Sequence, residues 1–97
     1  MIVKLTQNLS KGFLTWKEMV HENRETLKEY NGSIIFAGTE KEDDSKLTLI
    51  LEFDNPEGLQ KFANDEELKA KRAAAGAMLE TTIVTPMSTE SFTNFKP

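Results

Sequence analysis

The segment from Asn55 to Gly76 constrains the fold more than any other part of the chain, because it has the signals of two short helices held between two strand-like runs. Asn55 followed by Pro56 is typical of a helix start, since Asn caps free N–H groups and Pro lacks the N–H that would be left unpaired. The segment is expected to break at Asn64-Asp65, where Asp65 caps a second helix. Gly76 is expected to end that helix.

Four β-rich runs occupy most of the remaining chain. In the first and third runs, apolar residues alternate with polar ones, which predicts strands with one apolar face. Between the second and third runs, the stretch 40–45 has no apolar residue and is expected to be an exposed hairpin loop. The four runs are Met1–Gln7, Ser33–Thr39, Lys46–Asp54 and Leu79–Met87.

A longer helix is predicted between the first two runs. Ser10 is expected to cap it, Leu9 to pack against Leu14, and Asn31-Gly32 to end it in left-handed conformations. One stripe of this helix is apolar and is interrupted by Asn23. The stripe consists of Phe13, Trp16, Val20, Leu27 and Tyr30, with Met19 at its edge.

The element order is therefore βαββαβ, which predicts an α+β, ferredoxin-like domain with helices on one face of a four-stranded antiparallel sheet. Residues 1–87 form this single domain, and residues 88–97 form a polar tail whose Phe92 and Phe95 are expected to dock on a neighbour, such as a partner subunit. The opposite sheet face is expected to be covered by a twofold partner. Its apolar residues are predicted to be Ile2, Ile35, Ile50 and Val84.

Composition excludes several classes of protein. The formal net charge of −4 argues against nucleic acid as a partner, and the lack of cysteine excludes disulfides and thiolate metal sites. No apolar run approaches the ~20 residues that span a bilayer, and no signal-peptide pattern opens the chain. We therefore expect a cytoplasmic protein that does not bind membranes.

The chain resembles the dimeric α+β barrel superfamily, which includes antibiotic-biosynthesis-monooxygenase-like proteins and small haem-degrading enzymes. The resemblance rests on the run Leu49–Phe62, on Leu68 and on Ala75-Gly76, which is similar to the strand, turn and helix of that group. It implies a homodimer in which two sheets close into a barrel and each subunit keeps a pocket between its own sheet and helices.

The haem-degrading branch of the superfamily uses an Asn on the first strand and a Trp and a His on the second helical segment. The corresponding positions here are Leu5, Phe62 and Arg72, so none of the three residues is retained. We accordingly expect no haem degradation, and we expect no other cofactor-dependent activity and no bound cofactor.

Asn23 and Arg72 are the strongest site candidates, because each interrupts the apolar stripe of a helix that should face the sheet. A buried polar group without a partner costs roughly 1–3 kcal/mol. A water, a backbone carbonyl or exposure of the arginine head could satisfy these groups. Alternatively, they are the few polar groups of an apolar pocket, with Arg72 able to bind a carboxylate through two hydrogen bonds. Trp16 could stack on a ligand or simply fill the core.

Two further residues could serve acid–base chemistry. His21, the only histidine, lies among charged residues and is expected to be a solvated surface group with no metal site around it. Glu52, the one acid within a strand, is expected to pair with Lys4 across the sheet unless burial makes it a base.

The leading hypothesis is a homodimer that binds a small apolar molecule, with a fatty-acid-like carboxylate as one candidate ligand. The alternatives are a cofactor-independent monooxygenase or isomerase, and a structural or regulatory dimer without ligand. The residues expected to line the ligand site are Leu5, Trp16, Val20, Asn23, Leu27, Phe62 and Arg72.

Overall fold

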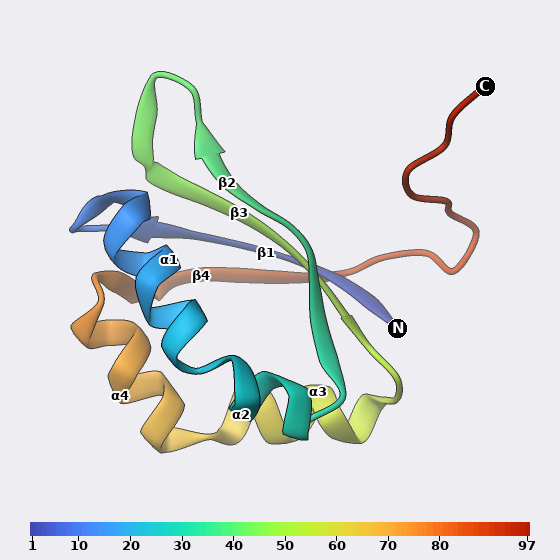
Figure 1. The fold of residues 1–97 in the computed structure, drawn as a ribbon, viewed down its shortest axis with the longest axis horizontal. Coiled ribbons are helices and arrows are strands. Elements are labelled where there is room, and N and C mark those ends of the chain that lie inside the picture. Colours follow the sequence, from blue (N-terminus) through green and yellow to red (C-terminus); the bar gives the residue numbers. More distant parts are fainter.

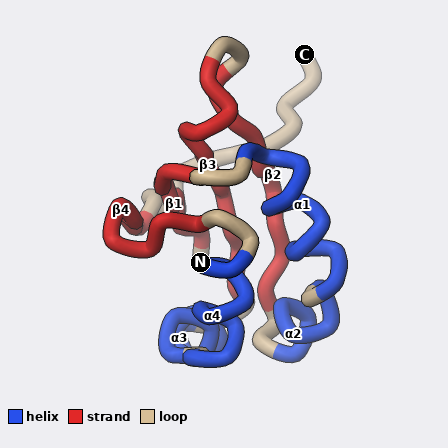
Figure 2. The backbone as a smooth tube through the Cα atoms, turned by 90° about the vertical axis from the view of Figure 1, so that its left-hand side faces the viewer, coloured by secondary structure: helices blue, strands red, loops and turns tan.

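The computed structural model describes residues 1–97 and has the predicted α+β architecture. Its four strands form one antiparallel sheet in the order β2-β3-β1-β4, the arrangement of a ferredoxin-like fold, and the helices lie on one side of it (Figures 1 and 2). The elements are β1 (Ile2–Leu9), α1 (Gly12–Glu22), α2 (Arg24–Glu29), β2 (Gly32–Glu40), β3 (Asp43–Phe53), α3 (Pro56–Asn64), α4 (Glu66–Ala74) and β4 (Ala77–Pro86).

The core lies between the helices and the two central strands. Alternate residues of β1 and β3 are buried, as their sequence pattern predicts, and the register places Leu5 opposite Leu49 on the same face. Helix α1 contributes Trp16 and Met19 to this core. The side chain of Phe53, at the end of β3, is 0% exposed.

The second helical segment follows its local signals. Asn55 Oδ1 accepts a hydrogen bond from the Gly58 N–H at 2.9 Å, and Asp65 Oδ1 accepts one from the Leu68 N–H at 2.8 Å. The break at Asp65 therefore gives two helices, α3 and α4, each with a side-chain cap. Gly76 ends α4 with φ of +102°, a conformation that favours glycine.

The first helical segment differs from the prediction, because it is two helices rather than one. Asn23 separates α1 from α2, and its side-chain amide donates to the Met19 carbonyl at 2.8 Å. Such local hydrogen bonds compete with the regular helical pattern. The predicted start of this helical segment was also wrong, because α1 begins at Gly12 and Ser10 does not cap it. Ser10 Oγ instead donates to the Gly76 carbonyl, and Leu14 is exposed and does not pack against Leu9 as expected. The left-handed Asn31 after α2 is confirmed, with φ of +57°.

The β2–β3 hairpin is tighter than expected. Glu40 pairs with Asp43, so only Lys41 and Glu42 lie outside the strands, in place of a loop over 40–45. Asp43 Oδ1 accepts hydrogen bonds from the Ser45 hydroxyl at 2.5 Å and from the Ser45 N–H at 3.0 Å. These two contacts, the hydroxyl first, lower the pKa of the Asp43 carboxyl.

Irregular pairing in the two edge strands changes the sheet face opposite the helices. Thr6 of β1 pairs with Ile83 of β4, and Asn8 of β1 pairs with Met78 of β4. A step of two residues along β1 is therefore matched by a step of five residues along β4. Residues paired across an antiparallel sheet share a face, so Val84, opposite Leu5, lies on the helix side and Ile83, opposite Thr6, lies on the other side. The prediction for Val84 was therefore wrong, because a bulge resets the alternation.

A second irregularity affects β2. The register shifts between Ile34 and Phe36, so Ile35 has no direct partner and Phe36 lies opposite Ile50. Ile2 and Ile50 lie on the side away from the helices, as predicted, and Phe36 and Ile83 lie there with them. We use the term open face for these four apolar residues.

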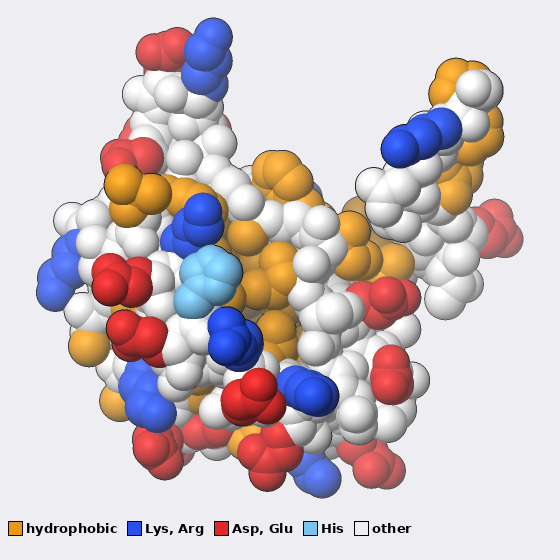
Figure 3. Space-filling model, in the orientation of Figure 1, with side chains coloured by type: hydrophobic (Ala, Val, Ile, Leu, Met, Phe, Trp, Pro, Cys, Tyr) orange, Lys and Arg blue, Asp and Glu red, His pale blue; other side chains and the backbone are white.

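The C-terminal tail, residues 88–97, has no helix or strand and extends away from the sheet (Figure 1). Phe92 and Phe95 are 78% and 66% exposed and contact each other, with ring centroids 5.1 Å apart. Hydrophobic side chains stand on the tail, clear of the body, and others group at the middle of the molecule (Figure 3). No helix of the chain is both long and apolar enough to cross a membrane.

Candidate functional site

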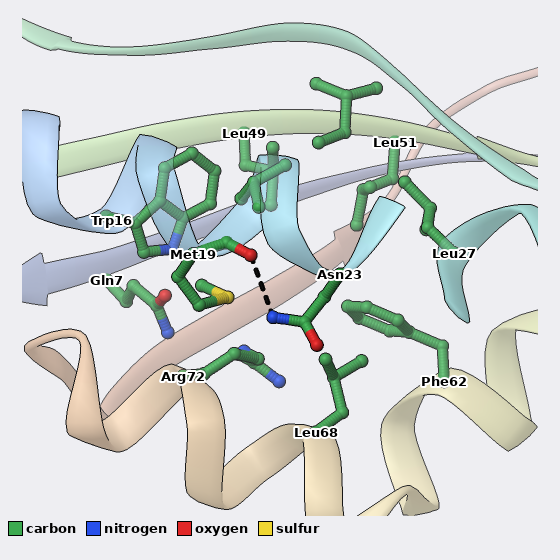
Figure 4. Close-up of a pocket in the computed structure, with 12 residues that line it drawn as sticks. Gln7, Trp16, Met19, Asn23, Leu27, Leu49, Leu51, Phe62, Leu68 and Arg72 are labelled. Carbon is green, nitrogen blue, oxygen red and sulfur yellow. Dashed lines mark hydrogen bonds between the residues drawn. The ribbon is translucent and has the colours of Figure 1, made fainter. Parts of the chain in front are cut away.

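An inner cavity lies between α1, α2, α3 and α4 and the helix side of the sheet (Figure 4). Its empty space, including the opening to solvent, is about 470 Å³, of which about 50 Å³ is open to the centre of a water molecule. Most of its lining is apolar, and no acidic side chain contributes to it. The lining residues are Gln7, Trp16, Met19, Val20, Asn23, Leu27, Ile34, Leu49, Leu51, Phe62, Leu68 and Arg72.

Arg72 is the only charged residue in this lining. Its guanidinium carbon lies 5.5 Å from the centre of the Phe62 ring, a cation–π distance. Burial lowers the pKa of the Arg72 guanidinium, since desolvation disfavours the charged form. The ion pairs of the chain are Lys69–Glu66 and Lys71–Glu67, so Arg72 has no acidic partner. The cavity therefore holds an uncompensated positive charge.

Trp16 supplies a second free donor. The residue is 4% exposed, yet its indole N–H has no hydrogen-bond partner. A buried donor left in this state carries a free-energy penalty that a ligand acceptor would remove. Phe13 packs beside it, with ring centroids 5.8 Å apart, so the Trp16 ring is both part of the core and part of the cavity wall.

Gln7 is the polar cavity residue that sequence reasoning missed. It is 3% exposed, and its amide nitrogen donates to Thr82 Oγ1 at 2.8 Å across the irregular part of the β1–β4 pairing. The available signal was its position on the apolar face of the first strand, two residues after Leu5. A polar residue there must be buried with the apolar ones.

The Asn23 side chain has a backbone partner, as the simpler interpretation expected, because its amide nitrogen donates to the Met19 carbonyl of α1. The amide still lines the inner cavity, and Figure 4 shows its oxygen on the side away from the Met19 carbonyl.

Six of the seven residues expected at the ligand site, Trp16, Val20, Asn23, Leu27, Phe62 and Arg72, meet around the inner cavity. Leu5 does not. It lines a second depression between α3, α4 and the β1–β4 side of the sheet, which we term the outer groove, and about 560 Å³ of this groove is open to the centre of a water molecule. Leu51, Phe62 and Arg72 line both spaces, so these residues form the boundary between them.

Glu52 and His21 lie outside both spaces. Glu52 is exposed on the face away from the helices, opposite Ile2 and Ser33, whereas Lys4 lies opposite Ile50. The expected Lys4–Glu52 pair is therefore wrong, because the register does not place them directly opposite and neither ion pair of the chain includes them. His21 is exposed, and no cluster of potential metal-ligating side chains is present.

Comparison with known proteins supports the fold. No family model and no curated protein matches the chain. Among solved structures, protein Atu4242 from Agrobacterium tumefaciens superposes with a TM-score of 0.53 at 14% identity, over 94% of this chain and 97% of that one. An uncharacterized NIPSNAP domain protein from Burkholderia xenovorans gives a TM-score of 0.48 at 10% identity, over 94% and 98% of the two chains.

The similarity to Atu4242 is one of fold. At 14% identity the superposition shows a shared ferredoxin-like α+β arrangement and carries no information about chemistry. Assignment to the dimeric α+β barrel superfamily remains a prediction from the sequence pattern. The function must therefore be argued from the inner cavity and its residues.

Proposed function

We propose that this protein binds a small apolar molecule that carries a carboxylate, and that the carboxylate meets Arg72. The observation that carries the proposal is the partly buried guanidinium of Arg72 without an acidic partner, in a cavity lined mostly by apolar side chains. Guanidinium and carboxylate groups form paired, charge-assisted hydrogen bonds. A ligand of this class would supply the missing negative charge.

The Trp16 indole N–H supports the same ligand class, since a carboxylate oxygen is an acceptor and the indole is a donor without a partner. About 50 Å³ of free space is enough for a few atoms at the head of such a ligand. Small-molecule pockets combine an apolar lining with a few polar groups in this way.

Binding is favoured over catalysis by the position of the acid–base candidates. Glu52 and His21 do not line the cavity, and Arg72 is the only ionisable group that does. The monooxygenase or isomerase hypothesis, the ligand-free structural dimer and the cytoplasmic location stay predictions.

We also propose that the chain forms a homodimer through the open face. Ile83 and Phe36 are 63% and 54% exposed, beside the partly buried Ile2 and Ile50 on the same side of the sheet. Exposed apolar groups gathered on one surface mark interaction sites, and a twofold axis would cover each copy with the same surface of the other.

Calorimetric titration with decanoate tests the ligand proposal. We expect binding to the wild-type chain and to Arg24→Met, and a loss of roughly tenfold or more in affinity for Arg72→Met, in line with the 1.5–3 kcal/mol of a charged hydrogen bond. Arg24 is the matched control because it is the only other arginine and is exposed. Equal binding by both variants, or no binding by the wild type, would overturn the proposal.

A further inference from the structure

The irregular part of β4 forms one wall of the outer groove. That irregularity brings Val84 to the helix side of the sheet, opposite Leu5, where both line the groove. Leu59 of α3 and Leu79 of β4 add to the apolar wall. A mostly apolar surface of this kind suits an alkyl chain better than a polar molecule.

The charges around the outer groove are of one sign. Lys69 and Arg72, three residues apart on α4, line it, and no Asp or Glu does. The chain as a whole carries a formal net charge of −4, so this cationic border is not a consequence of composition. Lys69 Nζ lies 3.3 Å from Glu66, whose side chain is largely exposed, a pair that contributes little in solvent.

Phe62 and Arg72 stand at the boundary between the outer groove and the inner cavity, and the guanidinium lies over the Phe62 ring. With no acidic partner, Arg72 can bind an anion from either side of this boundary. A ligand whose head meets Arg72 would then have its apolar part in the larger of the two spaces, which is the outer groove.

We propose that the outer groove binds the alkyl chain of an unbranched, medium-chain carboxylate whose head group lies at Arg72 beside the inner cavity. This inference rests on the proposed function and names its ligand class. A ligand confined to the inner cavity is disfavoured because that cavity alone offers only about 50 Å³ to the centre of a water molecule. The outer groove, at about 560 Å³, has room for the chain.

A chain-length series provides the test. Affinities for butanoate, hexanoate, octanoate and decanoate are measured by calorimetry with the full chain. If the alkyl chain is buried in the groove, each added methylene is expected to raise the affinity by up to about fourfold until the groove is full. Val84→Phe narrows the groove and should weaken decanoate binding at least tenfold while changing butanoate binding less than twofold.

Leu14→Phe is the control, because it adds the same ring to an exposed apolar residue of α1 that lies outside both the outer groove and the open face. It should retain the chain-length dependence of the wild type. Circular dichroism and light scattering on both variants report folding and assembly. Lys69→Gln is a second variant at the outer groove, and it is expected to weaken decanoate binding two- to fivefold.

The possible outcomes separate the two proposals. Equal affinities for all four acids, or undiminished decanoate binding by both Val84→Phe and Lys69→Gln, would overturn the groove assignment; loss of binding in Arg72→Met would still support the proposed function. Failure of every acid to bind the wild-type chain would overturn both.

Discussion

The hydroxyl of Tyr30 donates a hydrogen bond to Asp65 Oδ2 at 2.6 Å and so joins the end of α2 to the start of α4. The same carboxylate caps α4 through its other oxygen, Oδ1, which accepts from the Leu68 N–H at 2.8 Å. Asp65 thus links the two helical segments next to the break between α3 and α4. Both segments line the inner cavity, so this contact helps to set its width.

Tyr30 is the only tyrosine, so its ionisation can be followed by ultraviolet absorbance. Its hydrogen bond to Asp65 raises the pKa of Tyr30 to about 12. In Asp65→Asn the charge is lost, and the pKa of Tyr30 should return toward about 10. Glu67→Gln is the control, since it removes a neighbouring charge and leaves the hydrogen bond intact. An unchanged Tyr30 titration in Asp65→Asn would contradict the contact.

The same contact predicts how stability depends on pH. The folded-state pKa of Tyr30 is raised, so its contribution is fully present below the unfolded value of about 10 and is lost as pH rises toward about 12. The pKa of Asp65 is lowered, first by the Tyr30 hydrogen bond, so its contribution is present above about 3.9 and is lost as pH falls through the folded value. Urea unfolding of Tyr30→Phe should show a weaker loss of stability in both windows than the wild type.

Gly58 lies where α3 packs against the end of α2. A Cβ atom added to Gly58 would lie 2.2 Å from the Tyr30 carbonyl oxygen, a backbone atom that cannot rotate away. Gly58→Ala should therefore lower the free energy of unfolding by about 1–3 kcal/mol, although alanine normally favours a helix. Gly38→Ala is the control, because its Cβ would meet only the ring end of Phe36 at 3.0 Å. Equal chemical denaturation midpoints for the two variants would argue against the close approach.

Phe53 tests the core at the end of β3. It is 0% exposed and its ring packs against the tilted ring of Phe62, with centroids 5.6 Å apart, so Phe53→Ala should lower the free energy of unfolding by about 3–5 kcal/mol. Phe92→Ala removes the same ring from the tail and should change it by less than about 0.5 kcal/mol. Thermal and urea unfolding measure both. A large effect at Phe92 would show that the tail docks on a neighbour in solution.

The open face predicts the state of assembly. Light scattering should give twice the monomer mass of 11.0 kDa for the wild type, and Ile83→Lys should shift the protein toward monomer, because a charge would enter the apolar contact. Leu14→Lys is the control, since Leu14 is equally apolar and exposed but lies on α1, away from the open face. A wild-type monomer at micromolar concentration would rule out the homodimer.

Local signals in the sequence were sufficient for the element order and for the second helical segment. Asn55 and Asp65 cap helices through contacts only three residues long, and Gly76 ends α4 through its own backbone freedom. The buried faces of β1 and β3 followed from simple alternation, since each strand is regular along its whole length. Six of the seven expected cavity residues meet around the inner cavity because they lie on the inward-facing stripes of the two helical segments, a pattern that is also local in the sequence.

The features that depend on contacts between distant residues were not predicted from the sequence. The irregularity in β4 depends on how β1 and β4 align, and it accompanies the position of Val84 on the helix side and the hydrogen bond from Gln7 to Thr82. The hydrogen bond between Tyr30 and Asp65 joins residues 35 positions apart, and the free indole of Trp16 depends on what surrounds it. Local propensity encodes where helices and strands form, whereas bulges, partners and cavities depend on how those elements pack together.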